Sequence, residues 1–395
     1  MVVRKWLDNN FYGAIWSLVF QGQIAEWSIG GGANRYDGDH FGNITWMEHP
    51  GTNWPGYVWY RNNGLKNEFN IYGKINARIS GSISGFADLQ FRSVGYALSG
   101  RDDDMRNLTQ KHSYGFFNPK AGLFWNNGGG SDAYLSVAVA HREPTRSDFT
   151  DASGDAEVTP RPERLTDFEG GYTFRTADLS LGVNLYYMHY HDQLVPTGKI
   201  SNTGYPVMTN VAVSYRTGIE LTCSYRPSRI IGLKMNMTLS SSKIRNFRNY
   251  FFNYNTSDWS EEYTWSDLGN VDIAYSPGVV SSAEVQIDPL KNLGFRLTGK
   301  YIGKQYFDNT MSDDRSVDPY YFCNMTTEYT FSAGKMKEAA VRLAVNNFTD
   351  VLFGGNLYEN NAYGGMWTED GVEKTWSYFF PQAGINYMLG FSLTF

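Results

Sequence analysis

The stretch from Ala383 to Phe395 alternates between apolar residues and residues that are small or polar. Odd positions are apolar and end in Phe391, Leu393 and Phe395, whereas even positions are small or polar apart from Met388. Successive side chains of a strand point to opposite faces, so this two-residue period predicts a β-strand. A strand of about 9–11 residues is long enough to cross a bilayer when it is tilted.

The same period recurs along the whole chain. Apolar Phe69, Ile71 and Ile75 alternate with polar residues such as Glu68 and Lys74, for example. Segments of this kind predict an all-β protein of about fifteen strands. The predicted strands are 11–20, 24–34, 67–79, 85–91, 115–126, 132–141, 164–175, 178–191, 213–225, 231–244, 271–286, 293–306, 318–331, 338–347 and 382–395.

The connections between these strands alternate in length. Short turns are predicted at 21–23, 80–82, 127–130, 176–177, 226–228, 288–289 and 332–334. Long loops are predicted between the hairpins, among them 36–66, 98–114 and 348–380. Antiparallel transmembrane β-barrels have this rhythm, with short periplasmic turns and long extracellular loops. A soluble propeller or solenoid is the alternative architecture, but we find no repeat at the periods that those folds need.

Composition favours the membrane barrel. Aromatic residues make up 16% of the chain, with 28 Tyr and 11 Trp, as expected of rings that line membrane interfaces. The mean hydropathy is −0.43, and no apolar run of about 18 residues offers a transmembrane helix. A membrane protein of negative hydropathy is a barrel, because its lumen and loops are polar. The net charge of −6 argues against a nucleic-acid partner.

Catalytic and metal-binding patterns are not found in the sequence. The two cysteines, Cys223 and Cys323, are far apart and form neither a disulfide framework nor a metal pair. His189 and His191 share one strand face at a spacing that metals use, but no third ligand is near, so we interpret them as headgroup-level residues. No phosphate-binding loop, dinucleotide fingerprint or zinc motif occurs. We therefore expect no enzyme activity, cofactor or metal, and we interpret the charged residues on the predicted lumen face as the lining of a wet interior: Lys74, Arg78, Asp88, Arg92, Glu169 and Glu220.

Strand direction leads to an expectation about the start of the chain. If the carboxyl terminus is periplasmic, every odd strand runs toward the periplasm, and the first strand begins outside the cell. Complete single-chain bacterial barrels have an even number of strands. The first residues, Met1-Val-Val-Arg-Lys-Trp-Leu-Asp, have no apolar core of a signal peptide. We therefore expect the sequence to begin inside a barrel.

Several segments carry a resemblance to a known family. The chain resembles the carboxyl-terminal barrel of TonB-dependent outer-membrane receptors, of the Bacteroidetes type, over essentially its whole length. The segments concerned are LDNNFYG, NRYDGDHFG, NEFNIYGK, FFNPKAGL, HREPTRSDFTD, PERLTDFEGGY, KYIGKQYFDNT, VNNFTDVLF and YFFPQAGINYMLGFSLTF. The strongest combination is HREPTRSDFTD followed by the strand-end segment Asn346-Asn347-Phe348-Thr349-Asp350 and the terminal Phe395.

This resemblance implies a barrel of about twenty-two strands with an amino-terminal plug and a TonB box, in the outer membrane of a Gram-negative bacterium. Such receptors import scarce nutrients: ferric siderophores, haem, cobalamin or glycans. Implied partners are outer-membrane lipid, lipopolysaccharide, the small-molecule nutrient, TonB through the amino-terminal region, and the barrel assembly machinery through Phe395. Signal peptide, TonB box and plug are not found in residues 1–395, so we expect a partial barrel of about 15 of 22 strands that does not transport alone. The alternative is a plugless surface barrel acting as a passive pore or a partner-binding protein.

Candidate ligand contacts lie in the predicted loops. Exposed aromatic side chains stack on sugars and macrocycles, although interface girdles and loop packing use them equally well. The segment His141 to Asp148 is either a charged ligand patch or an internal salt-bridge cluster that shapes the base of its loop. The candidates are Trp46, Trp54, Tyr57, Trp59, Tyr60, Arg142, Arg146, Trp367, Trp376 and Tyr378.

Overall fold

The structure is a computed structural model that describes residues 1–49, 51–52, 56–152, 159–200, 205–332, 334, 337–352, 362–379 and 381–394. The chain divides into two compact units. Unit 1 comprises residues 1–123, 136–167 and 189–213, and unit 2 comprises residues 124–135, 168–188 and 214–395. Strands β5 to β9 contribute residues to both units.

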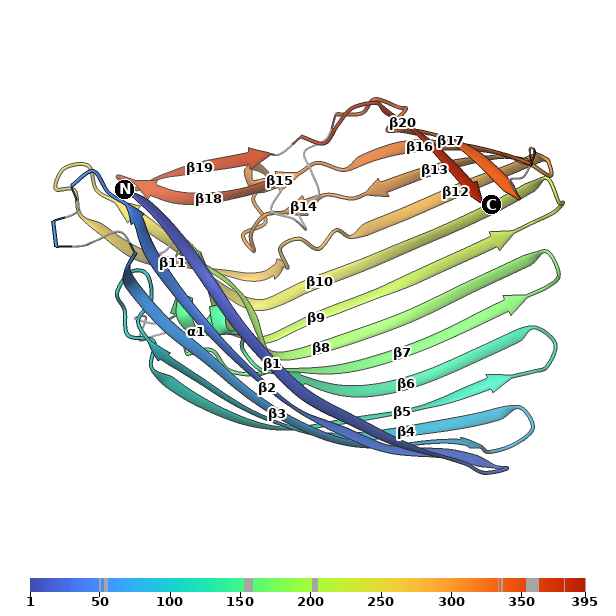
Figure 1. Cartoon of the computed structure of the whole chain (residues 1–395), viewed down its shortest axis with the longest axis horizontal. Helices are drawn as coiled ribbons and strands as arrows, with labels where there is room; N and C mark the ends of the chain where they lie inside the picture. The colour runs from blue at the N-terminus through green and yellow to red at the C-terminus, as the bar shows by residue number, and fades with distance from the viewer. Residues whose placement is uncertain are drawn as a thin grey trace. The chain divides into compact units, whose positions relative to one another are not determined.

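Unit 1 is built on an antiparallel ladder of four long strands in sequence order (Figure 1). These are β1 (Val2–Gln21), β2 (Ala25–Trp46), β3 (Tyr57–Arg78) and β4 (Ile83–Gly100). The unit also contains the helix α1 (Arg146–Ala152). Strands shared with unit 2 are β5 (Gln110–Asn126), β6 (Ser131–Arg142), β7 (Glu163–Arg175), β8 (Leu179–Ile200) and β9 (Pro206–Tyr225).

The β3–β4 ladder confirms the predicted alternation. Ile71 pairs with Phe91, and both side chains are exposed on one face. Lys74 pairs with Asp88 on the opposite face. Directly opposed residues of an antiparallel pair share a face, so each face of the ladder has one character. An exposed apolar face beside a polar one is the arrangement of a strand between lipid and a wet interior.

The predicted loop 36–66 is wrong in its extent. Strand β2 continues to Trp46 and β3 already begins at Tyr57, so the connection is short. The sequence there is rich in Gly, Asn and Asp, which strands usually avoid. Strand β2 pairs with β1 on one side and β3 on the other, and these two neighbours satisfy its backbone whatever the side chains are. The loop 98–114 shrinks likewise, to the residues between Gly100 and Gln110.

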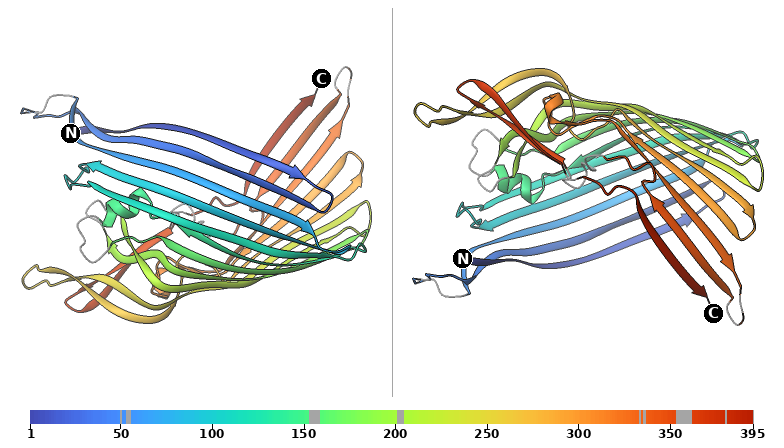
Figure 2. Two further views of the ribbon diagram at one scale, coloured as in Figure 1. Left: turned by 90° about the horizontal axis from the view of Figure 1, so that it is seen from below. Right: turned by 90° about the horizontal axis from the view of Figure 1, so that it is seen from above.

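Unit 2 contains a second antiparallel ladder, which runs from the end of β9 in the order β9, β10, β12, β13, β16, β17 and β20. Figure 2 shows β17 and β20 side by side near the carboxyl terminus. The bounds are β10 (Ile231–Tyr254), β12 (Val279–Leu290), β13 (Leu293–Ile302), β16 (Tyr320–Phe331), β17 (Glu338–Asn346) and β20 (Asn386–Thr394).

Short turns join the strands at one end of unit 2. The Asn127 amide donates to the Ser131 carbonyl over 3.1 Å, and the Thr176 amide donates to the Leu179 carbonyl over 2.7 Å. The predicted turn at Asp288-Pro289 is wrong, because both residues lie inside β12. The β12–β13 register shifts between Ile287 and Leu290, and proline is tolerated in strands at such irregularities. The turn itself is at residues 291–292.

The described residues contain twenty strands, more than the fifteen predicted. Four of the additional strands lie mostly or wholly in predicted loops: β11 (Glu261–Asp272), β15 (Ser316–Val317), β18 (Ala362–Glu369) and β19 (Val372–Phe379), with a 3-10 turn η1 (Asp313–Arg315) before β15. The fifth, β14 (Gln305–Tyr306), is the end of the predicted strand 293–306, which is broken after Ile302. The predicted strand 271–286 is broken between β11 and β12. Ser276-Pro277-Gly278 lies in the gap, where proline cannot donate to a ladder. The remaining fifteen strands correspond to the fifteen predicted ones.

Buried apolar residues form small separate clusters near loops. One cluster in unit 1 joins Tyr96, Leu98, Leu108 and Phe149. One in unit 2 joins Phe307, Val317 and Tyr320. Most large apolar side chains on the strands are instead exposed, as expected where lipid takes the place of a core. Within the described part of the chain, we find no helix with the length and apolar character needed to cross a membrane.

Candidate functional site

Helix α1 of unit 1 is fixed by a reciprocal cap. The Thr145 amide and hydroxyl both donate to Asp148 Oδ2 over 2.7 Å, and the Asp148 amide donates back to Thr145 Oγ1 over 3.3 Å. This is a capping box, which satisfies amides that a helix start leaves open. Phe149 anchors the other side of the helix: it is 2% exposed and stacks on His112 at 4.0 Å. The cap and the anchor together fix the position of Arg146.

The segment before α1 takes part in an ion network of two basic and two acidic side chains, whose charges cancel. Glu143 accepts hydrogen bonds from Lys66 Nζ at 2.6 Å and from Arg92 Nη1 at 2.7 Å. Arg92 also binds Glu68 through Nε at 2.6 Å. Glu143 follows β6, outside the span that a membrane strand needs. Burial opposes its charge, but the bonds from Arg92 and Lys66 dominate and lower the pKa of Glu143 to about 2.

Arg146 differs from the arginine of that network, because its hydrogen bonds are incomplete. Its Nη2 donates to Asn62 Oδ1 at 2.5 Å, and Asn62 is 2% exposed. The Nε atom of Arg146 is buried, and no hydrogen-bond acceptor for it is found among the described residues. No described carboxylate forms an ion pair with it either. A buried donor without a partner is costly, so the position favours a ligand or water that accepts from it.

His40 lies beside this arginine and is unsatisfied as well. It is paired across the ladder with Asn62, which holds Arg146. Its Nε2 atom is buried without a hydrogen-bond partner among the described residues. The positive charge of Arg146 and the negative charge of Asp39 both act on the His40 ring. We call His40, Asn62 and Arg146 the Arg146 cluster.

Two of the predicted aromatic contacts are brought together. The rings of Trp59 and Tyr60 meet edge to face, with centroids 5.0 Å apart. Both lie against Gly42 of β2, where a Cβ atom would overlap the two rings. Tyr60 is buried and within electrostatic reach of Arg146, whereas Trp59 is half-buried. These rings and the Arg146 cluster form one candidate contact region in unit 1.

The other candidates of unit 1 have different surroundings. Trp46 and Tyr57 are exposed at the ends of β2 and β3. Arg142 is engaged by Glu163, with 2.8 Å from Nε to Oε2 and 2.9 Å from Nη2 to Oε1, so this guanidinium holds the base of the loop. Trp54 and the terminal Phe395 lie outside the described residues.

The remaining three candidates lie on the β18–β19 hairpin of unit 2. Trp376 and Tyr378 are exposed on β19, with ring centroids 5.3 Å apart. Trp367 on β18 is half-buried and pairs with Phe252 of β10, in a short parallel contact.

Arg315 fastens this hairpin to the preceding loop. It is 2% exposed, and it binds Asp308 Oδ2 at 2.8 Å, Thr310 Oγ1 at 2.8 Å and Glu373 Oε1 at 3.1 Å. Thr375 Oγ1 accepts a further bond at 3.2 Å. Every donor nitrogen of this guanidinium therefore has a partner.

The sequence interpretation missed His40, Asn62 and Arg315. Nothing local distinguishes them, because their roles arise from neighbours far away in the sequence. Helix α1 did carry a signal, since Thr145-Arg-Ser-Asp148 fits the capping-box pattern. His189 and His191 do share one face, with their Nε2 atoms 3.2 Å apart. Asp102, Asp103 and Asp104 also gather, but Asp103 and Asp104 are paired with Lys5 and Arg106.

Comparison with known families decides the assignment. A family model described as "TonB dependent receptor-like, beta-barrel" matches residues 5–348, well over half of the chain. The chain belongs to the TonB-dependent receptor β-barrel family. The predicted all-β, antiparallel barrel fold is thereby confirmed, and so is the prediction that the protein is not an enzyme, because the family consists of transporters. The family also places the chain in the outer membrane of a Gram-negative bacterium.

Solved receptors share the fold at low sequence identity. The siderophore receptor PiuA from Acinetobacter baumannii has a TM-score of 0.72 at 14% identity, covering 98% of this chain and 56% of its own. The copper transporter OprC has a TM-score of 0.73 at 12% identity, with 100% and 58% covered. The ferric citrate transporter FecA reaches 0.68 at 13% identity, with 98% and 55% covered. The chain thus spans just over half the length of these receptors, and no curated protein sequence matches it.

Proposed function

We propose that this TonB-dependent receptor barrel takes part in the energised uptake of a scarce nutrient, and that the Arg146 cluster contacts the nutrient. One observation supports the assignment of the Arg146 cluster as a ligand site. Arg146 Nε and His40 Nε2 are both buried without hydrogen-bond partners in the described part of the chain, and the two side chains are within electrostatic reach of each other. Buried polar atoms normally have partners, so an accepting group of a ligand explains these two.

The surroundings favour a ligand with both polar and flat apolar parts. The Trp59 and Tyr60 rings offer a stacking surface. Arg146 offers a planar donor fork that suits carboxylate or other oxygen-rich groups. The related structures are named for a siderophore, copper and ferric citrate, which supports a metal or metal chelate as the cargo. Ferric siderophores are therefore our first candidates, with haem, cobalamin and glycans as the further classes.

The proposal includes partners. TonB and a nutrient ligand follow from the family in general terms. We further propose contacts with lipopolysaccharide and outer-membrane lipid along the exposed apolar strand faces, and a second ligand-contact surface at Trp376 and Tyr378. A receptor of the Bacteroidetes type is supported by the resemblance of segments such as HREPTRSDFTD. Recognition of Phe395 by the assembly machinery remains part of the proposal.

The test is equilibrium binding on cells that lack receptors of their own. Cells displaying the chain are incubated with radiolabelled ferric citrate, ferric catecholates, haem, cobalamin and an oligosaccharide. We expect saturable binding of at least one compound, and at least tenfold weaker binding after Arg146→Gln at equal surface expression. Arg142→Gln is the matched control, because its guanidinium is held by Glu163, and it should leave the affinity unchanged. Absence of binding across the panel would contradict the proposal.

Energised uptake is tested separately, with this barrel in a full-length receptor that also carries a plug and a TonB box. Removal of TonB, or of the proton gradient, should abolish accumulation of the label inside the cells and leave surface binding intact. Accumulation that persists without TonB would favour the passive pore instead.

A further inference from the structure

A pocket of about 480 Å³ with both charged and apolar lining residues lies at the short-turn end of unit 2. Arg229 comes from the turn between β9 and β10, and Lys291 and Asn292 form the turn between β12 and β13. Glu328 comes from β16. The strands β10, β12, β13 and β16 are consecutive neighbours in the ladder, so the pocket rests on one continuous piece of sheet.

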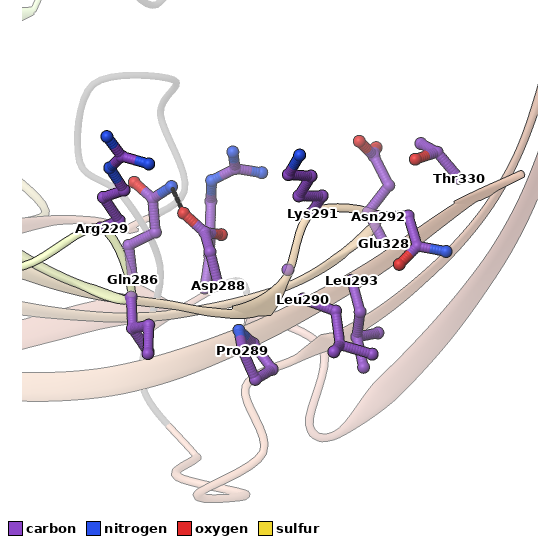
Figure 3. Close-up of a pocket in the computed structure, with 13 residues that line it drawn as sticks. Arg229, Gln286, Asp288, Pro289, Leu290, Lys291, Asn292, Leu293, Glu328 and Thr330 are labelled. Carbon is purple, nitrogen blue, oxygen red and sulfur yellow. Dashed lines mark hydrogen bonds between the residues drawn. The ribbon is translucent and has the colours of Figure 1, made fainter.

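The charged side chains of the pocket lie on one face of that piece of sheet. In Figure 3 the side chains of Arg229, Asp288 and Lys291 rise on one side of the ribbon, and those of Leu290 and Leu293 lie on the other. Leu290 is 59% exposed. The apolar side of the turn therefore suits lipid, although Leu290 and Leu293 also contribute to the lining of the pocket.

The carboxylates of the pocket are already engaged. Asp288 Oδ2 accepts from Gln286 Nε2 at 2.6 Å and from Arg226 Nη2 at 3.3 Å. Glu328 Oε2 accepts from Arg342 Nε at 2.7 Å. Arg226 and Arg342 lie outside the lining of the pocket, so each acidic group has its counter-charge elsewhere.

Three cations of the lining have no such counter-charge. Arg229, Lys291 and Arg296 are exposed, and we find no described carboxylate oxygen within 4.0 Å of their charged nitrogens. Three like charges around one pocket repel one another and raise its potential. An anion that binds among them relieves this repulsion.

We propose that this pocket is a binding site for a multiply charged oxyanion that carries phosphate or carboxylate groups. Arginine forks bind such groups in two-point fashion, and lysine adds a mobile donor. The pocket is far larger than the roughly 30 Å³ that one molecule occupies in liquid water, so a compact polyanion fits inside it. Asn292 supplies a neutral donor and acceptor for further ligand oxygens.

A soluble anion fits the pocket better than a lipid headgroup. A phospholipid bound there would have its acyl chains on the polar face, away from Leu290 and Leu293. The site is independent of the Arg146 cluster, which lies in unit 1, and its failure would not affect the proposed uptake function.

The test is calorimetry of the purified full chain in detergent, with pyrophosphate and citrate as probes at low salt. We expect saturable binding of at least one probe, weakened at least tenfold in the triple variant Arg229→Gln, Lys291→Gln, Arg296→Gln. Affinity should also fall as salt rises. Arg248→Gln, which removes an exposed cation of β10 that is paired with Asp267 of β11, is the control that should bind as the wild type does.

A second arm separates the two sources of phosphate. Vesicles of phosphatidylglycerol should not displace the soluble probe any better than vesicles of phosphatidylcholine. Displacement by phosphatidylglycerol alone would overturn the soluble anion in favour of a headgroup. Absence of saturable binding, or equal binding by a triple variant that keeps the wild-type heat-modifiable electrophoretic mobility, would overturn the site.

Discussion

Two arginines of this receptor, Arg315 in the turn η1 and Arg146 at the start of α1, have opposite surroundings. Arg315 in unit 2 is saturated by Asp308, Thr310, Glu373 and Thr375. Arg146 in unit 1 has one neutral partner, Asn62, and a buried Nε without an acceptor in the described part of the chain. A saturated guanidinium holds loops together, whereas an unsaturated one has donors left for a ligand. The number of hydrogen-bond partners of each guanidinium therefore distinguishes an arginine that stabilises the fold from one that can bind a ligand.

The largest effect is expected at the saturated arginine. Arg315→Met leaves Asp308 with an uncompensated charge in a partly buried site. Removal of one partner from a buried ion pair costs about 3 to 5 kcal/mol. Urea unfolding in detergent should show a loss of that order, and hydrogen exchange in 362–379 should accelerate. If the variant is as stable as the wild type and β18–β19 stay protected from hydrogen exchange, Arg315 does not stabilise the fold.

The next effect concerns the saturated network below α1. The pKa of Glu143 is about 2 in the folded state, below its ordinary 4.5, so its charge stabilises the fold above pH 4.5. That stability is lost as the pH falls from 4.5 toward 2, and the shift corresponds to about 3 kcal/mol. Urea unfolding as a function of pH is the measurement, and Glu143→Gln should flatten the profile. An equally steep profile in that variant would assign the acid sensitivity to other groups.

Arg146 is expected to behave in the opposite way to Arg315. Arg146→Gln removes a charge that no described carboxylate balances, so the free energy of unfolding should change by less than about 1 kcal/mol. Ligand affinity should fall at least tenfold, which is about 1.4 kcal/mol. Unfolding and ligand binding, measured on the same preparation, test the predicted stability and the predicted affinity together. A large loss of stability would place Arg146 with Arg315 as a structural residue.

The smallest effect is expected at the helix cap. Thr145→Ala removes the hydroxyl that bonds the Asp148 amide, at a cost of about 1 kcal/mol. Ligand affinity should weaken modestly, because α1 positions Arg146. The wild type is the reference. Equal stability of Thr145→Ala and the wild type in urea unfolding would show that the cap does not hold the helix.

Strand positions follow from the sequence because a membrane wall imposes one simple pattern. The alternation of Ile71 with Lys74 and of Leu89 with Asp88 reflects lipid on one side and water on the other. The extension of β2 through Asp37 and His40 follows no such pattern, since it depends on pairing with β1 and β3. The strands were therefore predicted too short wherever both faces are polar.

The sites were predictable only where chemistry is local. Trp59, Tyr60 and Arg146 stood out as aromatic and charged residues in a loop, and the structure brings them to one region. The distinction between Arg142, Arg146 and Arg315 was not predictable. It depends on whether a carboxylate from a distant segment, such as Glu163 or Glu373, arrives at the guanidinium. Long-range pairing of this kind leaves no periodic signal in a single sequence.

The central claim is that Arg146, and not Arg142, meets the ligand. Its most direct test is the binding curve of the best ligand of the panel on cells displaying wild-type, Arg146→Gln or Arg142→Gln receptor at equal surface density. We predict at least tenfold weaker binding for Arg146→Gln and an unchanged curve for Arg142→Gln. Equal affinity of wild type and Arg146→Gln would contradict it.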